Sequence, residues 1–163
     1  MPHSLRLALA LAALAMPARA DDVIRHKLPN SDFPILSAVE VPAGRTTVYL
    51  SGAGPTVADS SAPARSVQAY GDTAAQTMST LKAIEGTLQR LGLDTGDVVK
   101  MTVFLVADPA ANGRMDFDGL MRSYRQFYGT PAQPNLPTRS VVQVSALANP
   151  GWLVEIEVTA VRR

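Results

Sequence analysis

Two side chains near the end of the chain, Arg139 and Glu155, combine residue types suited to anion binding and to proton transfer. The guanidinium of an arginine is a planar fork that binds a carboxylate through two hydrogen bonds, and it stays charged when it is partly buried. A glutamate can take a proton from water and return it, as a general base and then as a general acid. Together the two residues suit a hydrolytic step on a small ligand that carries a carboxylate.

Other kinds of active site are excluded by composition. The chain has no cysteine, which excludes disulfides, a thiolate nucleophile and thiolate-bound metals. Its two histidines are His3 and His26, and neither lies in a cluster of carboxylates that could complete a zinc site. No nucleophile elbow accompanies them, so a Ser-His-Asp triad is not expected. We therefore expect no metal and no cofactor.

The N-terminus has the pattern of a secretory signal peptide over residues 1–20. Arg6 precedes an apolar run over residues 7–16, and Pro17 comes before the small-x-small site that ends at Ala20. The run is too short to span a bilayer, and a buried N-terminal helix is the alternative interpretation. No cysteine is available for a lipid anchor. The pattern predicts cleavage after Ala20, export to a periplasm and a single domain over residues 21–163.

The charge balance argues against nucleic acid as a partner. The chain has 15 basic and 14 acidic side chains, and cleavage would remove Arg6 and Arg19, leaving 13 against 14. No basic stripe remains of the kind that neutralises phosphates. We expect no nucleic-acid partner and no membrane contact after cleavage of the signal.

The first half of the mature chain predicts short strands followed by a helix. Strands are expected at residues 23–27, 35–41 and 46–51, with a turn over residues 42–45. Residues 55–71 are rich in Ser, Ala and Pro, and are expected to form an exposed loop with weak order. Asp72 can cap a helix that runs to about residue 91 and ends at Gly92. Its apolar stripe is expected to comprise Ala74, Ala75, Met78, Leu81, Ile84 and Leu88.

The second half predicts a strand, a helix and a hairpin. The nearly continuous apolar run at residues 98–107 indicates a central strand covered on both faces. A second helix is expected to begin at Asn112 or Asp116 and to end at Gly129. Its inward side chains would be Phe117, Leu120, Met121, Tyr124 and Phe127. The alternating runs at residues 138–147 and 152–160, joined by the turn-forming residues 148–151, predict a hairpin. This order of elements is typical of an α+β fold with one mixed sheet and two helices on one face.

The predicted hairpin indicates which side chains lie on the same face of the sheet. In its second strand Trp152, Val154, Ile156 and Val158 would face the core. The opposite face would carry Val141, Gln143, Ser145, Glu155 and Glu157, a mixture that suits an interface between subunits. In this register Arg139 pairs near Thr159 and Glu155 near Gln143. The two site residues then lie roughly 13 Å apart along the strands. We therefore expect a neighbouring subunit to complete the site.

Three stretches of the sequence resemble the RidA (YjgF-type reactive intermediate deaminase) family. They are residues 49–54, residues 91–104 and the C-terminal pair of segments at residues 136–144 and 154–161. The resemblance covers about residues 33–163. It implies a chorismate-mutase-like fold, a homotrimer with sites between subunits, and hydrolysis of 2-imino or enamine acids to 2-oxo acids and ammonia. It also implies that Arg139 holds the substrate carboxylate, that Glu155 activates water, and that Gly52 and Val141 supply backbone groups around the ligand.

The sequence departs from the family's pattern at two positions that we expect to border the ligand. Ile35 stands where deaminase-active members usually have Tyr, and Met121 stands where they usually have Asn. Both changes remove hydrogen-bonding groups and make the expected pocket more apolar. The departures leave two alternatives open beside the deaminase: a trimer that binds small ligands without catalysis, and a protein-protective role. A nuclease role fits poorly with the acidic mature chain and its single histidine.

Overall fold

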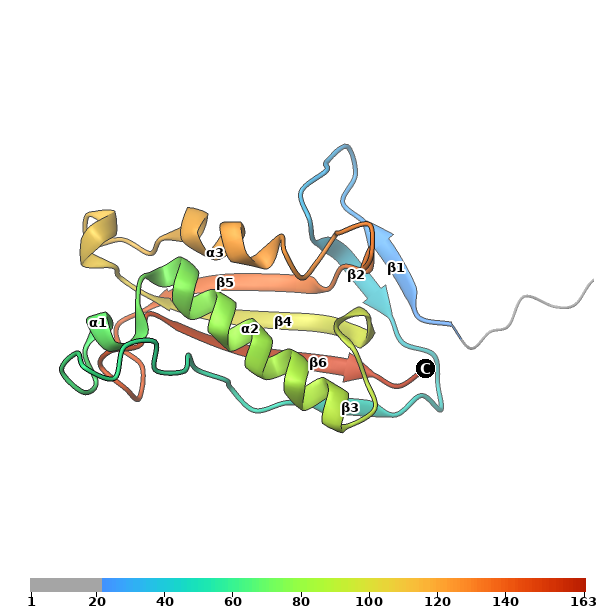
Figure 1. The fold of residues 1–163 in the computed structure, drawn as a ribbon. Helices are drawn as coiled ribbons and strands as arrows, with labels where there is room; N and C mark the ends of the chain where they lie inside the picture. Colours follow the sequence, from blue (N-terminus) through green and yellow to red (C-terminus); the bar gives the residue numbers. More distant parts are fainter. Residues whose placement is uncertain (1–21) are drawn as a thin grey trace, which may run out of the picture.

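One mixed sheet, with helices on one of its faces, makes up residues 22–163, the part of the chain that the computed structural model describes (Figure 1). The predicted signal peptide, residues 1–20, lies outside the described residues. The strands are β1 Ile24–Lys27, β2 Leu36–Glu40, β3 Thr47–Tyr49, β4 Val98–Val106, β5 Thr138–Val144 and β6 Val154–Val161. The helices are α1 Val67–Tyr70, α2 Thr73–Arg90 and α3 Phe117–Tyr124, with 3-10 turns η1 Thr95–Asp97 and η2 Pro109–Ala111. The expected α+β fold class is confirmed.

The order of the strands corrects the predicted C-terminal hairpin. The six strands lie in the order β1-β2-β5-β4-β6-β3. β4 is inserted between β5 and β6, parallel to β5 and antiparallel to β6. The predicted pairing of Arg139 with Thr159 and of Glu155 with Gln143 is therefore wrong. The reason is that β4, the most apolar strand, gains a hydrogen-bonded neighbour on each side when the last two strands separate to enclose it.

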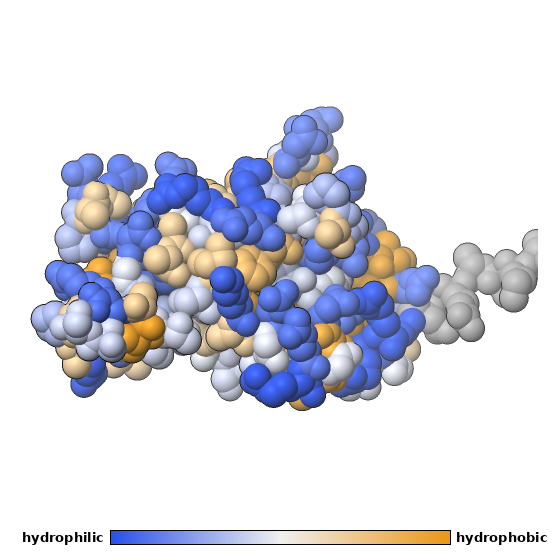
Figure 2. Space-filling model, in the orientation of Figure 1, coloured by the Kyte–Doolittle hydropathy of each residue, from blue (hydrophilic) through white to orange (hydrophobic). Residues whose placement is uncertain are grey.

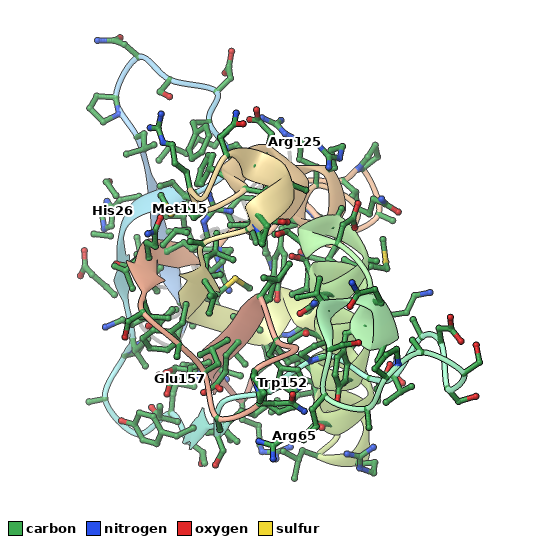
Figure 3. All side chains as sticks on the ribbon, turned by 90° about the vertical axis from the view of Figure 1, so that its left-hand side faces the viewer. His26, Arg65, Met115, Arg125, Trp152 and Glu157 are labelled. Atoms are coloured by element: carbon green, nitrogen blue, oxygen red, sulfur yellow. The ribbon has the colours of Figure 1, made fainter. Side chains whose placement is uncertain are left out.

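The helices α2 and α3 cover one face of the sheet; in Figure 1, α2 crosses in front of the strands and α3 runs beside β5. We call this side the helix face and the other side the open face. On β6, Val154, Ile156, Val158 and Ala160 are buried towards the helices, as the alternation predicted. Glu157 lies on the open face, on the far side of the strands from α2 (Figure 3).

The open face differs from the prediction in two ways. β4 is central, as expected, but only its helix face is fully buried: Lys100 is exposed, and Thr102 and Phe104 are half-buried. Within this one chain, β4 is thus not covered on both faces. Val141 and Gln143 also lie on the helix face rather than the open face, because Val141 pairs with the buried Val103. The open face of β5 carries Ser140 and Val142 instead.

Both long helices begin at the predicted aspartates. The Asp72 side chain accepts a hydrogen bond from the backbone N–H of Ala75, and Asp116 does the same for Gly119. The predicted stripe on α2 is only partly correct, because Ala75 is exposed and polar residues replace it in the core. The buried set of α2 is Thr73, Gln76, Thr77, Thr80, Leu81, Ile84 and Leu88. α3 ends at Tyr124, one turn before the predicted end at Gly129.

Residues 55–71 are more ordered than predicted. The segment contains α1, capped by Ser66, and it buries Tyr70. Tyr70 meets the ring of Trp152 edge-on, with 6.4 Å between ring centroids. Trp152 also packs directly against Gly54, where a side chain would not fit. The only tryptophan of the chain thus fixes this loop to the turn before β6.

The outer surface of the helix layer is mostly hydrophilic, with hydrophobic side chains in small separate areas (Figure 2). No helix within residues 22–163 combines the length and the apolar character needed to cross a membrane.

Candidate functional site

Arg139 lies on β5 among aromatic rings of the helix face. It pairs with Met101 of β4, whose side chain is fully buried below the helices. The guanidinium carbon is 4.2 Å from the centroid of the Tyr124 ring. It is 5.6 Å from the Phe33 centroid and 5.9 Å from the Phe117 centroid. We call Phe33, Phe117 and Tyr124 the aromatic box. Contacts of this kind stabilise a cation by about 0.5–2 kcal/mol each.

No carboxylate of residues 22–163 pairs with this cation. Within residues 22–163, the Arg139 guanidinium makes no hydrogen bond or ion pair, and its Nη1 atom is buried without a partner. Burial lowers the pKa of Arg139; the Tyr124 side chain opposes this shift, and nearby Arg125 adds to it. A partly buried charge without a counter-ion is unfavourable. A ligand carboxylate that binds here would balance the charge of the Arg139 guanidinium.

The aromatic box is held in place by bonds of its own. The Tyr124 hydroxyl donates a 2.8 Å hydrogen bond to the carbonyl of Pro34, the residue after Phe33. Tyr128 stacks on the Tyr124 ring, with 4.9 Å between centroids. Burial raises the pKa of Tyr124 to about 12, so its hydroxyl keeps its proton at neutral pH. The ring that faces Arg139 is thus fixed in position and uncharged.

Glu155 lies on the open face of β6, against Gly52. It pairs with Phe104 of β4, and a methyl group added to Gly52 would overlap the Glu155 carboxylate. The neighbouring Ala53 bridges to Ile156, which holds the Gly52 segment against β6. The structure therefore brings together two of the predicted site residues, Glu155 and Gly52.

The structure does not bring Arg139 and Glu155 together within one chain. Arg139 pairs with Met101 of β4 and points to the helix face, whereas Glu155 pairs with Phe104 of β4 and points to the open face. Two strand spacings and three residues separate them, so their Cα atoms are roughly 14 Å apart, with their side chains on opposite faces. One chain alone therefore cannot place both groups on one small ligand.

The remaining predicted site residues lie on the Arg139 side. Val141 is on the same face of the same strand as Arg139, and it packs against the core. Ile35 is half-buried next to Leu36, which pairs with Thr138 of β5. Met121, on α3, is only 7% exposed and belongs to the hydrophobic core.

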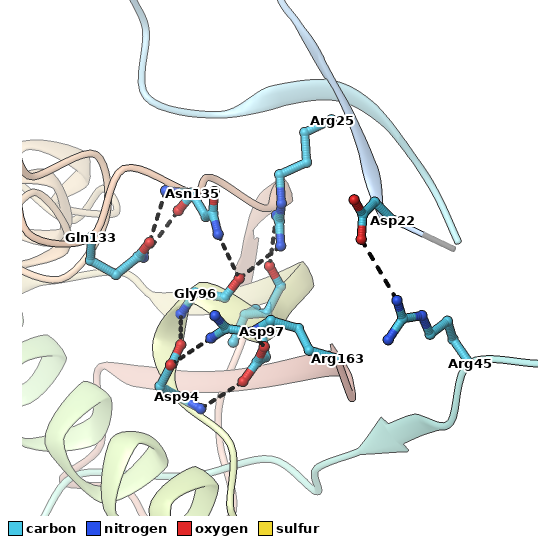
Figure 4. Close-up of polar contacts among 10 residues, drawn as sticks. Asp22, Arg25, Arg45, Asp94, Gly96, Asp97, Gln133, Asn135 and Arg163 are labelled. Carbon is cyan, nitrogen blue, oxygen red and sulfur yellow. Dashed lines mark hydrogen bonds and ion pairs between the residues drawn. The ribbon is translucent and has the colours of Figure 1, made fainter. Parts of the chain in front are cut away.

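A second group of bonded polar side chains lies where β4 and β5 begin (Figure 4). Arg25 of β1 donates to the carbonyls of Val98, Leu136 and Gly96, at 3.1, 2.5 and 2.8 Å. Arg163 donates to Asp97 and Asp94, at 2.5 and 2.6 Å. Arg25, Asp97 and Arg163 line a cavity of about 320 Å³. Arg25 and Arg163 already have hydrogen-bond partners within the chain. We therefore interpret this group as structural: it connects β1 and the C-terminal residue to η1 and the start of β4.

A metal site is not apparent in the described region, where no three His, Asp or Glu side chains gather closely enough to hold an ion. Sequence reasoning identified Arg139 but missed Phe33 as part of its surroundings. The signal that could have found it is weak: Phe33 directly precedes Pro34, at the point where the chain must turn into β2.

Comparison with known proteins gives three informative similarities. The profile of the family described as Endoribonuclease L-PSP matches residues 37–162. Protein DfrA of Myxococcus xanthus is 36% identical over 134 residues, which cover 82% of this chain and 88% of that protein. The 2-iminobutanoate/2-iminopropanoate deaminase of Escherichia coli K12 is 35% identical over 92 residues, which are 56% of this chain and 66% of the enzyme. The match thus spans slightly less than two thirds of the deaminase.

The fold is also found among solved structures. A Yersinia pestis protein described as YyfB of the conserved Rid family superposes with a TM-score of 0.62 at 25% identity. The match covers 85% of this chain and 96% of that one. β1 and the Phe33 segment precede the region matched by the family profile.

Proposed function

The chain belongs to the family described as Endoribonuclease L-PSP, the RidA family that its sequence resembles, and from this premise we propose that it hydrolyses 2-imino or enamine acids to 2-oxo acids and ammonia. Relatives in this family are named as imine deaminases. The observation that carries the proposal is the Arg139 guanidinium, which is partly buried and has no anionic partner within residues 22–163. A substrate carboxylate would supply the missing charge.

In the proposed reaction Arg139 holds the carboxylate, and Glu155 acts on water. Glu155 accepts a proton as the water oxygen bonds to the imine carbon, and passing that proton to the nitrogen gives a carbinolamine. Glu155 then carries the hydroxyl proton of the carbinolamine to the nitrogen as the carbon–nitrogen bond breaks, and ammonia and the 2-oxo acid leave. Gly52 contributes by leaving room for the Glu155 carboxylate. This chemistry needs no cofactor.

The site in this proposal lies between two copies of the chain. Arg139 and Glu155 are on opposite faces of one sheet, so a ligand that touches both must receive them from different subunits. The open face supports such an assembly because it carries Tyr49 at 80% exposure and Val142 at 43%, large apolar groups that a partner could cover. We propose a homotrimer, in keeping with the family resemblance, and light scattering of the protein from Asp21 onward would measure its mass.

The activity is tested with imines made in the assay by an L-amino acid oxidase and trapped with semicarbazide. Wild-type protein should accelerate the loss of imine, and Arg139→Ala and Glu155→Gln should each abolish the acceleration. Arg122→Ala is the matched control, because Arg122 is an exposed arginine of α3, 3.6 Å from Asp116. If Arg139→Ala is as active as Arg122→Ala, the assignment of Arg139 is wrong.

Mixing the two inactive variants tests the shared site. Arg139→Ala and Glu155→Gln, unfolded and refolded together in equal amounts, form trimers in which some interfaces carry both intact residues. Random assortment leaves about one quarter of interfaces intact, so about one quarter of wild-type activity should return. No recovery, in trimers shown to be mixed, would mean that each site lies within a single chain.

A trimer that binds carboxylates without catalysis is the second candidate. It is favoured by Ile35 and Met121, which place apolar groups where a deaminase of this family would have hydrogen-bonding ones. Calorimetric binding of a 2-oxo acid that depends on Arg139, with no acceleration of imine loss, would identify this function instead.

A further inference from the structure

Phe33 is the most exposed member of the aromatic box, and it lies outside the part of the chain that the family profile matches. It is 36% exposed and stacks against Phe117, with 6.3 Å between centroids and 13° between ring planes. Both rings border the Arg139 guanidinium. An apolar ring that remains open to solvent beside an unpartnered cation is a surface for a ligand with both a carboxylate and an apolar side chain.

Three hydrogen bonds fix the segment that carries Phe33. The Pro34 carbonyl accepts from the Tyr124 hydroxyl at 2.8 Å, and the Leu36 N–H donates to the Pro137 carbonyl at 3.0 Å. The Ile35 N–H closes a tight turn on the Phe33 carbonyl, at 2.8 Å. Pro34 itself is buried. The ring is therefore held over β5 and α3 before any ligand arrives, and a ligand would not have to order it.

Space for a side chain exists beyond Phe117. A cavity of about 460 Å³ opens there, lined by Met115, Phe117 and Gln143 among others. Met115 is tied to β5 by a 2.9 Å hydrogen bond from its N–H to the Gln143 side chain. The cavity meets the aromatic box at Phe117, and its rim also carries the charged side chains of Arg114, Asp116 and Asp118. A ligand held at Arg139 thus has an aromatic surface beside it, with this cavity next to Phe117.

We propose that Phe33, with Phe117, selects ligands that carry an aromatic side chain, so that the preferred substrates are 2-imino acids derived from aromatic amino acids. This inference rests on the proposed function and specifies its substrate class. The carboxylate binds Arg139, and the substrate ring packs on the exposed face of Phe33. A ring-on-ring contact adds about 0.5–1.5 kcal/mol to the area it buries, which corresponds to a preference of up to about tenfold.

The test compares imines derived from phenylalanine and from alanine, with kcat/KM measured for each. Wild type should prefer the phenylalanine-derived imine. Phe33→Ala and Phe33→Leu should each lose about tenfold on that imine, since leucine keeps apolar bulk but has no ring face. Because Phe33 also borders the Arg139 guanidinium, activity on the alanine-derived imine should fall too, but by less, so that the ratio of the two kcat/KM values falls. Ile24→Ala is the control, because Ile24 is a 51% exposed apolar residue of β1. An equal loss on both imines, or no loss on either, would overturn the proposal.

Tyr124→Phe provides a second variant that tests the positioning of Phe33. It removes the hydrogen bond to Pro34 but keeps a ring over Arg139. The ratio of kcat/KM for the phenylalanine-derived imine to kcat/KM for the alanine-derived imine should fall. Unchanged preference in this variant would contradict a fixed Phe33.

Binding separates this inference from the proposed function. Phenylpyruvate and pyruvate are stable 2-oxo acids, and their affinities can be measured by calorimetry without turnover. If wild type hydrolyses no imine but binds phenylpyruvate more tightly than pyruvate, and Phe33→Ala removes the difference, the proposed function fails and the aromatic selectivity stands. Equal affinity for the two acids in wild type would overturn the selectivity whatever the outcome for hydrolysis.

Discussion

Arg25 and Arg139 are two half-buried arginines of the same sheet with opposite surroundings. Burial lowers the pKa of both, yet Arg25 donates to three backbone carbonyls, whereas Arg139 has no hydrogen-bond acceptor within residues 22–163. Arg25 joins β1 to the segments that lead into β4 and β5, and Arg139 faces aromatic rings. The comparison teaches that burial alone does not mark a functional arginine. What distinguishes Arg139 is that its donors are left for a molecule that the chain does not contain.

Replacing each arginine by methionine tests this comparison most directly. The largest effect is expected on the activity of the Arg139 variant. Arg139→Met should reduce imine hydrolysis by more than about a hundredfold, because loss of a charge-assisted hydrogen-bond pair to the substrate costs about 3 kcal/mol or more. Its thermal stability should change by less than that of the matching Arg25 variant, because removing a partly buried charge without an anion offsets the loss of its contacts with the aromatic rings. Activity assays and calorimetric melting check both parts.

Arg25→Met should show the reverse pattern, with a loss of stability of about 3 kcal/mol. The change leaves three backbone carbonyls without their donor, and hydrogen bonds from a charged group are worth about 1.5–3 kcal/mol each. The total loss is smaller than their sum because Arg25 is half-buried and water can replace part of what it donates. Urea unfolding measures the change, and activity per folded molecule should be preserved. A variant as stable as wild type would show that Arg25 is no more than a surface group.

The stability of the protein at alkaline pH tests the contact between Arg139 and Tyr124. Burial raises the pKa of Tyr124 to about 12, while Arg139 opposes that shift. An unfolded tyrosine ionises near pH 10, so this contribution to stability is fully present below about pH 10. It falls as pH rises towards 12, by about 2 kcal/mol in total.

Absorbance of the tyrosinate and the free energy of unfolding, measured together, follow this loss. Tyr124→Phe should remove it. Arg139→Met should move the titration of Tyr124 to still higher pH, because the neighbouring cation is gone. A titration that Arg139→Met leaves in place would contradict the close contact between the guanidinium and the ring.

The smallest effect is expected at the exposed pair of His26 and Glu40, which lie 2.7 Å apart on β1 and β2. Both side chains are largely solvated, at 46% and 66% exposure. Exposed pairs contribute about 0–1 kcal/mol, so Glu40→Gln should change the free energy of unfolding by less than about 0.5 kcal/mol. The change in unfolding free energy of Glu40→Gln serves as the reference for that of Arg25→Met, because both substitutions affect contacts of β1. A loss as large as that of Arg25→Met would mean that simple disruption of β1 explains both.

The sequence was sufficient to predict the fold class, most elements and the two helix caps, because these depend on local patterns. Alternation identified the buried face of β6, and Asp72 and Asp116 marked the helix starts. The strand order could not be predicted in this way. A hairpin is the simplest pairing of two neighbouring strands, and no local signal shows that β4, more than thirty residues earlier, lies between them.

That missed insertion also explains why the surroundings of Arg139 were only partly predicted. The residue type pointed to anion binding, but its face depends on its pairing with Met101, a contact between distant parts of the chain. Phe117 and Tyr124 were predicted to point inward on α3 without any link to Arg139. Phe33 became part of the site only through the turn at Pro34. Sites assembled from long-range contacts need the structure.

The position of β4 also determines when the protein can fold. Both neighbours of β4 follow it in the chain. β3, which lies far upstream, pairs with β6 and so cannot join the sheet before β6 is present. A chain leaving the ribosome therefore cannot assemble the centre of its sheet until residues 154–161 have emerged. Pairing β4 with both neighbours depends on long loop closures, which makes it slow. Until residues 154–161 have emerged, β4, the most apolar strand, lacks its neighbour β6 and is open to aggregation.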